Sequence, residues 1–533
     1  MPQRKWWETG VVYQIYPRSF QDSGRSGTGD LAGIITRLGY LADVLGVDSL
    51  WISPFFPSPM KDFGYDISDY TDVDPLFGDL ATFDRLLEKA HARGLRIIID
   101  WVPNHTSDQH AWFLDSRSSR QAVHRDWYIW ADASSDGSPP NNWVSMFGGA
   151  AWQWDEPTGQ YYLHSFLKEQ PDLNWRNAET REAMYDTLRF WLDRGVDGFR
   201  IDAAHMIMKD PQLRDNPLRE RYQGPDEYPR FVHRYDQRHS DMHRVFREIN
   251  ALLASYPGDR VSIGEVATDR WDRFVAYYGI DGDGLHLPFN FDLIFNTAWD
   301  ADAVRASVDG YEAALPKGAW PNHVFGNHDH PRLATRIGRK QARVGAMMLL
   351  TLRGTPTLYY GGELGMADVH IPLDRQHDPM ANREQGQRRD GCRTPMQWTE
   401  GRHAGFTAPD APAPWLPLND DYRTHNVAVE LTDPTSMLSL YRHLLALRKT
   451  TPALSQGDYE AIDGAPDGCF AYLRLERSQR MAVLLNMTSF PLRVNLSGGG
   501  AGSVAVSTHL DRSDQVSLTD VELRADEGIV IEL

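Results

Sequence analysis

The sequence predicts a (β/α)₈ barrel with an inserted subdomain after its third strand and an antiparallel β domain at its C-terminal end. Short apolar runs alternate with longer amphipathic runs over most of the chain, which is typical of parallel strands covered by helices. One long irregular stretch, 106–175, interrupts this alternation. From about residue 455 the pattern changes to short alternating runs typical of antiparallel strands.

Seven runs rich in β-branched and aromatic residues are predicted as barrel strands, and an eighth is expected near 284–293. The seven runs are 11–20, 49–54, 96–102, 198–204, 261–266, 323–329 and 355–364. Between them, 81–94 and 180–195 have the spacing of amphipathic helices and end at Gly94 and Gly195, which are C-cap signals. Eight strand–helix units indicate a TIM-barrel architecture.

The interruptions set the expected domain boundaries. The barrel is predicted to span 1–105 and 176–454, and the inserted subdomain 106–175, which is rich in Ser, Asp, Gly, Pro and Trp. A second irregular stretch, 366–430, follows the eighth strand. The C-terminal β-sandwich domain is predicted to span 455–533.

Composition and charge exclude several classes of protein. Of the 533 residues 41% are hydrophobic, as in soluble globular proteins. The longest apolar run, 344–352, is far shorter than the roughly 18 residues of a membrane helix. With 55 basic and 73 acidic residues the net charge is −18, which disfavours nucleic acid and anionic membranes as partners and favours small neutral substrates.

Targeting and cysteine signals point to the cytoplasm. The first residues show no secretory signal pattern. Two cysteines, Cys392 and Cys469, cannot build a disulfide framework or a Cys-rich metal site. We therefore expect a cytoplasmic protein without a cofactor or metal, and the sequence leaves its oligomeric state open.

Polar side chains gather at the ends of four predicted strands, where barrel enzymes carry their chemistry. Arg200 and Asp202 are two apart on a strand, so both face one side. The arginine is expected to lower the pKa of Asp202 and keep it ionised, as a nucleophile requires. Glu265 lies in an apolar run, where desolvation is expected to raise its pKa, as a general acid requires. The other polar residues at these ends are Asp100, Asn104, His105, Asn327, His328 and Asp329.

Each of these residues also has a structural interpretation. A single aspartate after a strand is more often a turn residue or a helix N-cap than a catalyst. A single histidine there is usually a hydrogen-bonded structural residue, and Arg200 alone could be an ion-pair partner. Carboxylates, histidines and an arginine together on four strand ends favour a catalytic site.

The motifs DWVPNH, GFRID, GEV and GNHD, in this order, resemble the conserved regions of glycoside hydrolase family 13, the α-amylase family. QPDLNW (170–175) and RTPMQW (393–398) are similar to its α-glucosidase and oligo-1,6-glucosidase branch, and WWETGVVYQIYPRSF and GYDISDY add to the resemblance. It extends from about residue 6 to about residue 450, followed by a C-terminal domain of the family's kind.

The resemblance implies a role for each matching position. Asp202 matches the nucleophile, Glu265 the acid/base, and Asp329 the third carboxylate, which stabilises the positively charged sugar. Asp62 and Arg393 match the pair that binds the non-reducing-end hydroxyls in exo-acting members. The other positions that match sugar-binding residues are Tyr65, His105, Phe147, Phe166, Gln170, Arg200 and His328. The aromatic members of this set have core packing as their alternative.

The implied activity is that of an exo-acting, retaining α-glucosidase. It would release glucose from the non-reducing end of maltose and other short α-glucosides. Retaining hydrolysis needs two carboxyl groups roughly 5–5.5 Å apart. When a sugar alcohol replaces water in the second step, the product is a new glucoside, so transglucosylation is an expected side reaction.

Three departures from the family pattern bear on this expectation. The calcium loop often written DSNGDGIGD is DSGRSGTGD here, and Gly24, Arg25 and Ser26 leave too few oxygen ligands for Ca²⁺. Ala203 follows the nucleophile, where Val is associated with α-1,6 preference and Thr with α-1,4 preference. Linkage choice is therefore open, with α-1,4 favoured. His205 could contact the leaving group or be structural.

Several other functions remain as alternatives. The first is an oligo-1,6-glucosidase, followed by a trehalose synthase or a sucrose-splitting enzyme. A catalytically inactive scaffold, as in transporter heavy chains, would be expected to have a membrane helix and to have lost the carboxylates. A metal-dependent hydrolase using the GNHDHP segment lacks a supporting ligand spacing such as HExxH.

Overall fold

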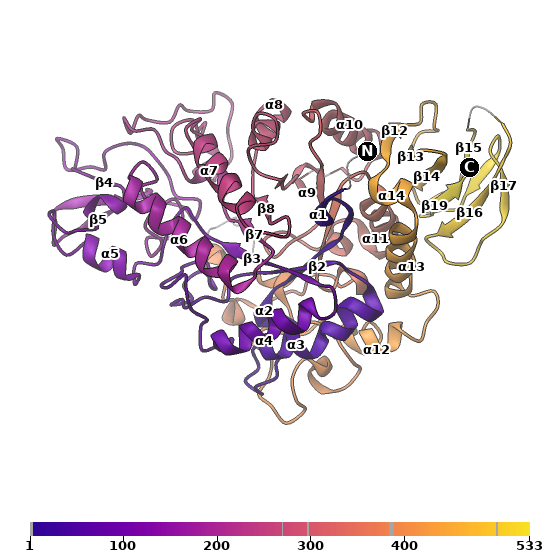
Figure 1. Ribbon diagram of the computed structural model, residues 1–533, viewed down its shortest axis with the longest axis horizontal. Helices are drawn as coiled ribbons and strands as arrows, with labels where there is room; N and C mark the ends of the chain where they lie inside the picture. The colour runs from indigo at the N-terminus through magenta and orange to yellow at the C-terminus, as the bar shows by residue number, and fades with distance from the viewer. Residues whose placement is uncertain (1–3, 269, 296–297, 383–388, 497–498) are drawn as a thin grey trace.

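The computed structural model describes residues 4–268, 270–295, 298–382, 389–496 and 499–533, and its centre is a barrel of eight parallel strands (Figure 1). The strands are β1 (Val12–Ile15), β2 (Ser49–Ile52), β3 (Arg96–Trp101), β7 (Gly198–Ile201), β8 (Val261–Gly264), β9 (Leu287–Pro288), β10 (Asn322–Val324) and β11 (Thr355–Tyr359). Their order in the sheet is β10-β11-β1-β2-β3-β7-β8-β9, and a parallel bridge between Asn290 and His323 joins its two ends. All eight predicted strands are confirmed.

Helices surround the barrel. They include α3 (Leu31–Gly39), α4 (Leu80–His91), α6 (Ala178–Arg194), α7 (Met242–Ala254), α8 (Trp271–Val275), α10 (Ala301–Ala314), α11 (Leu333–Thr351) and α13 (Met437–Thr450). The Asn177 side chain caps the start of α6, and Gly195 ends it with φ 102°, a left-handed value that glycine adopts without strain. Helix α4 ends at His91, and Gly94 lies in the turn after it with φ 76°.

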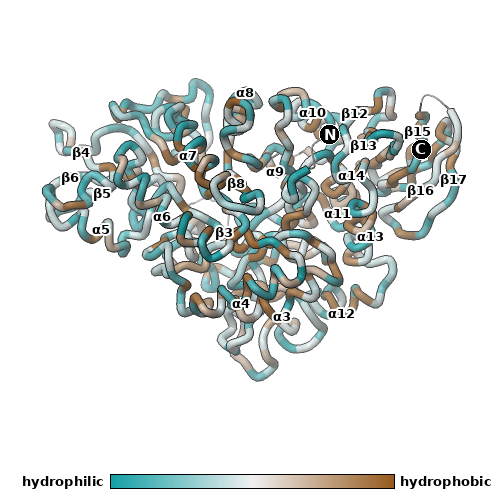
Figure 2. The backbone as a smooth tube through the Cα atoms, in the orientation of Figure 1, coloured by the Kyte–Doolittle hydropathy of each residue, from teal (hydrophilic) through white to brown (hydrophobic). Residues whose placement is uncertain are grey.

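Two apolar layers hold the barrel together. The inner layer contains Val12, Trp51, Ile98 and Ile263, which project into the barrel, and a larger layer packs the strands against the helices. Apolar residues occur on both the strands and the helices, while the loops around the rim are more hydrophilic (Figure 2). This double burial explains why the strands are near-continuous apolar runs.

The two additional units lie at opposite ends of the long axis (Figure 1). After β3, the chain forms α5 (Ala111–Ser116) and an antiparallel sheet of β4 (Trp130–Ala131), β6 (Gln160–Leu163) and β5 (Trp152–Asp155). The C-terminal unit holds a six-stranded sheet of β12 (Asp458–Ala461), β13 (Cys469–Glu476), β14 (Gln479–Asn486), β19 (Gly528–Glu532), β16 (Ala501–Ser507) and β17 (Gln515–Ser517). The strands β15 (Leu492–Val494) and β18 (Val521–Leu523) form a second sheet. The exact domain boundaries stay a prediction.

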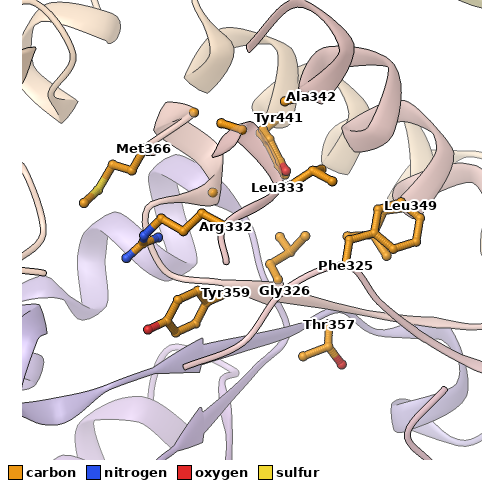
Figure 3. A pocket seen from close by; sticks show the side chains of 14 residues that line it. Phe325, Gly326, Arg332, Leu333, Ala342, Leu349, Thr357, Tyr359, Met366 and Tyr441 are labelled. Carbon is orange, nitrogen blue, oxygen red and sulfur yellow. The ribbon is translucent and has the colours of Figure 1, made fainter. Parts of the chain in front are cut away.

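A small apolar cavity lies between α11 and the barrel (Figure 3). Its volume is about 40 Å³, and Phe325, Leu333 and Tyr441 contribute to its lining. The Arg332 guanidinium lies 4.8 Å from the centroid of the Tyr359 ring at its side. Since one water occupies about 30 Å³, the cavity is too small for a substrate and belongs to the core. No helix within the described ranges has the length and apolar character needed to cross a membrane.

Candidate active site

A cavity of about 290 Å³ opens at the carboxyl ends of the barrel strands. This is the low end of the roughly 300–1,000 Å³ of small-molecule sites. It is lined by Asp62, Tyr65, His105, Met146, Phe147, Phe166, Asp202, Ala203, His205, Met206, Glu265, Ala267, Phe291, Asp329, His330, Met380 and Arg389. The sequence predicted eight of these as site residues. They lie in the segments that follow β2, β3, β7, β8 and β10.

Arg200 joins three carboxylates at the base of this cavity. Its Nη1 lies 2.7 Å from both Asp100 Oδ1 and Asp202 Oδ1, and its Nη2 lies 2.7 Å from Glu265 Oε2. The sheet register explains the first contact, because Asp100 on β3 pairs with Arg200 on β7. Asp202 and Glu265 are therefore bound to neighbouring nitrogens of one planar guanidinium, which fixes the two carboxylates relative to each other.

Glu265 is also bound to the backbone next to Asp202. Its Oε2 accepts a hydrogen bond of 2.9 Å from the backbone N–H of Ala203. Ala203 is 3% exposed and has φ 42° and ψ 38°, a left-handed conformation that is unusual for a residue with a Cβ. This turn directs the Ala203 N–H at Glu265 immediately after the Asp202 side chain.

The charge state of Asp202 differs from the sequence-based expectation. Burial raises the pKa of Asp202 well above its ordinary value, and Glu265, Asp100 and Asp329 raise it further, while Arg200 acts in the opposite direction. Arg200 therefore acts in the predicted direction, but the expectation of a lowered pKa for Asp202 was wrong, because it left out burial and the three neighbouring carboxylates. A positive charge that develops on a bound sugar would oppose this shift, because it attracts the charged form of the carboxyl group.

Asp329 is ionised between two arginines. Its Oδ1 lies 2.8 Å from Arg393 Nη2 and 3.1 Å from Arg389 Nη1. Burial acts against ionisation, but the surrounding positive charges outweigh it and lower the pKa of Asp329. His328 is neutral, since burial lowers its pKa well below the ordinary value, so the arginines supply this charge.

A hydrogen-bonded chain orients His328. Gln14 Nε2 lies 2.8 Å from His328 Nδ1, and His328 Nε2 lies 2.6 Å from the Tyr65 hydroxyl, which donates to Asp100 Oδ2 at 3.1 Å. Because an amide nitrogen donates, the histidine carries its proton on Nε2. Tyr65, predicted as a wall residue, is thereby held with its ring along the cavity.

Arg389, which the sequence analysis did not select, is the cation that binds Asp62. Its Nη2 lies 2.7 Å from Asp62 Oδ1, and the guanidinium is 5.5 Å from the centroid of Phe147. Arg393 instead binds Asp329 and donates to the His328 carbonyl at 2.7 Å. The two arginines are four positions apart in RRDGCRTPMQW, and only Arg393 lies inside the recognisable motif RTPMQW.

The remaining predicted residues lie together beside Asp62. Gln170 Nε2 donates to Asp62 Oδ2 at 3.3 Å and lies 3.0 Å from His105 Nε2. Burial lowers the pKa of His105 to about 4, so its ring is neutral. The Phe166 ring lies 5.0 Å from the His105 ring. The structure therefore brings all twelve predicted residues to one site, although Gln170, Arg200, His328 and Arg393 lie behind the cavity surface.

The comparisons with known proteins agree with this geometry. The family description "Alpha amylase, catalytic domain" matches residues 14–457. The chain belongs to the α-amylase family, glycoside hydrolase family 13. It is a glycoside hydrolase.

Individual relatives carry different activity names. A probable alpha-glucosidase of Rhizobium meliloti (strain 1021) is 41% identical, with 91% of this chain and 90% of that protein covered. An oligo-1,6-glucosidase of Heyndrickxia coagulans is 38% identical, with 91% and 92% covered. The crystal structure of the alpha-glucosyl transfer enzyme XgtA superposes with a TM-score of 0.91 at 42% identity, covering 99% of this chain and all of that one.

A long loop without a recognisable sequence pattern lies beside this family 13 site, where the Arg238 backbone N–H donates to the carbonyl of the lining residue His205 at 2.7 Å. Residues 207–241 connect the end of β7 to α7 and contact the inserted subdomain. Asn142 and Asn216 exchange hydrogen bonds of 2.8 and 3.0 Å, and Trp143 Nε1 donates to the Arg214 carbonyl at 2.8 Å. The loop has no periodic pattern, so only its proximity to Asp202 in the sequence could have indicated it.

Lys209 anchors this loop inside the protein. Its Nζ lies 2.6 Å from Asp172 Oδ2, Asn104 Oδ1 and the Met206 carbonyl. The side chain is 2% exposed. The ammonium group therefore joins the end of the inserted subdomain, the loop after β3 and the loop after β7, all of which contribute cavity residues.

Hydrogen bonds to Asp22 and Asp30 stabilise the segment at the position of the family's calcium loop. Asp22 Oδ2 accepts hydrogen bonds of 2.7 Å from Gly27 N and 2.6 Å from Thr407 Oγ1. Asp30 accepts from Ser23 and Gly24 and caps α3 through Gly33 N, while Arg25 pairs with Asp410. The expectation that no calcium binds here stays a prediction.

Proposed function

We propose that this chain is an exo-acting, retaining α-glucosidase that releases glucose from maltose and short α-glucosides, with transglucosylation as a side reaction. Asp202 is the nucleophile and Glu265 the acid/base. Asp329 stabilises the cationic sugar, and Arg200 holds the two reacting carboxyl groups in register. The proposal includes a cytoplasmic location, since Cys392 and Cys469 are buried free thiols.

In the first step Asp202 attacks the anomeric carbon, and Glu265 gives its proton to the departing oxygen as that bond breaks. A covalent glucosyl ester and a free sugar result. In the second step Glu265 takes the proton of a water or sugar hydroxyl, which displaces Asp202 from the sugar. Two inversions leave the α-configuration unchanged.

The observation that carries the exo assignment is the Asp62–Arg389 ion pair. It lies at 2.7 Å among the lining residues, with Phe147 against the arginine. Both partners line the cavity, so their charged groups can bind the terminal hydroxyls of one glucose. A cavity of about 290 Å³ fits a short substrate rather than a polymer groove.

Exo-action predicts single glucose units as the first product. With amylose or maltoheptaose, we expect glucose from the earliest time point and slow loss of the longer chain. A time course resolved by product length and anomer, with maltose as reference, checks this. Early maltotriose or larger fragments would contradict a closed cavity, and initial β-glucose would contradict retention.

Linkage choice is expected to depend on Ala203. Thr at this position should raise the ratio of kcat/KM for maltose over isomaltose, and Val should lower it, by about 10-fold or more since a pocket contact of this size gives roughly 10–200-fold discrimination. Both β-branched residues also strain a backbone at φ 42°. The ratio within one protein cancels any loss common to both substrates.

Ala203→Gly is the matched control, because it removes the strain without narrowing the cavity. Its ratio should stay within about twofold of wild type. If Thr and Val also leave the ratio within twofold, linkage choice lies in the inserted subdomain, in the 207–241 loop or in 366–430. The same four proteins assayed on sucrose and trehalose test the remaining alternatives.

A further inference from the structure

A second, basic hollow lies beside the catalytic cavity. It has a volume of about 840 Å³ and is formed by the 207–241 loop, the start of α7 and the segment around α8. Its charged lining includes Arg214, Arg234, Arg238, Arg273, His239 and Asp272. We call it the basic hollow. Its size is within the range of small-molecule sites.

Three of the four arginines that line the basic hollow form no ion pair with a described residue. Asp272 is paired with Arg270 at 2.6 Å, and Arg214 with Asp210 at 2.8 Å. Among the residues that the structure describes, Arg234, Arg238 and Arg273 have no ion-pair partner. Three such guanidinium groups around one space are unexpected in a chain of net charge −18. Guanidinium groups bind phosphate and carboxylate oxygens through paired hydrogen bonds.

One segment separates the basic hollow from the catalytic cavity. The Arg238 backbone N–H donates to the His205 carbonyl at 2.7 Å, and Arg238 Nε donates to the Ala267 carbonyl at 3.2 Å. His205 and Ala267 both line the catalytic cavity, on the side of Ala203. A sugar that leaves from Asp202 or arrives there is therefore close to the basic hollow.

We propose that the basic hollow binds a phosphate monoester and that the leaving or accepting sugar of this enzyme can carry that group. The three unpaired guanidinium groups match a dianion better than a single carboxylate. The second part of the proposal rests on the proposed α-glucosidase activity, whereas the binding of phosphate itself does not.

Binding is tested on the full chain in a phosphate-free buffer of low ionic strength. Inorganic phosphate and glucose 6-phosphate are titrated by calorimetry into the wild type, the double variant Arg234→Glu/Arg273→Glu, and Arg93→Glu. Arg93 is an exposed arginine after α4, at the opposite end of the barrel strands. Circular dichroism and melting temperature establish that each variant is folded.

We expect saturable binding to the wild type and to Arg93→Glu, and binding at least about tenfold weaker to the double variant, because two attractive charges become repulsive. Equal affinity for the two ligands would show that the phosphate group alone is recognised. Tighter binding of glucose 6-phosphate would show that the sugar is recognised as well. Unchanged binding by the double variant, or no binding by the wild type, overturns the proposal.

A second measurement compares kcat/KM for maltose with that for maltose bearing a phosphate on its reducing-end glucose. The ratio of phosphorylated to neutral substrate should fall about tenfold in the double variant and stay constant in Arg93→Glu. An unchanged ratio refutes the link to catalysis. If no protein hydrolyses maltose, the α-glucosidase assignment fails, while the binding result still decides the phosphate site.

Discussion

Replacing Asp202 with asparagine is expected to reduce the turnover of maltose by at least about 10³-fold. The amide has the size of the carboxylate but cannot form the glucosyl ester. Arg200 also loses one of its three carboxylate partners, at 2.7 Å, although Asp100 and Glu265 continue to hold it. Loss of chemistry rather than loss of fold should therefore dominate.

Asp197→Asn is the matched control for this substitution. Asp197 precedes β7, whereas Asp202 follows it. Asp197 is also buried, and it forms ion pairs with Arg260 at 2.8 Å and His91 at 2.6 Å. We expect this control to lower the melting temperature but to keep kcat within a few-fold of wild type. Glucose release and intact-protein mass with an activated glucoside are measured for both. A folded Asp202→Asn protein with more than about a tenth of wild-type turnover would disprove the nucleophile assignment.

Glu265→Gln is expected to slow maltose hydrolysis by roughly 10²–10⁴-fold. The amide cannot protonate the departing sugar oxygen. An activated aryl glucoside needs no such proton, so it should still form the covalent intermediate, which then hydrolyses slowly. The amide can still accept from the Ala203 N–H, so the turn after Asp202 should persist.

The readout is the ratio of kcat/KM for the aryl glucoside to that for maltose, which should rise by at least about tenfold. Glu312→Gln serves as control, because Glu312 on α10 pairs with Arg353 at 2.8 Å, away from the cavity. Its ratio should match wild type. Equal losses on both substrates in Glu265→Gln would assign the proton transfer to another group.

The sequence predicts the barrel well because its strands are buried on both faces. Runs such as RIIIDWV (96–102) can only be satisfied between an apolar interior and a helix layer. The place of the strand-end residues could be predicted as well, since parallel strands bring their carboxyl ends to one edge of the barrel. Asp100, Arg200 and Glu265 meet there because the register of β3, β7 and β8 aligns them.

The parts that the sequence could not predict depend on loops and on collective charge. RRDGCRTPMQW contains arginines at 389 and 393, and only the fold shows that Arg389 is the one bound to Asp62. The upward shift of the Asp202 pKa comes first from burial and then from carboxylates at three other strand ends, which no local pattern reveals. The 207–241 loop has neither period nor motif, so its place beside the cavity follows from tertiary contacts alone.

Lys209 has a consequence for how this protein can be altered. Its ammonium group contacts Asp172 in the inserted subdomain, Asn104 after β3 and the Met206 carbonyl. This contact joins the inserted subdomain to the barrel. The hydrogen bonds between Asn142 and Asn216 join the inserted subdomain to the 207–241 loop as well. The inserted subdomain and the 207–241 loop therefore form one structural unit. An exchange of specificity between relatives has to transfer both segments together, because either one alone would leave a buried charge or a pair of amides without its counterpart.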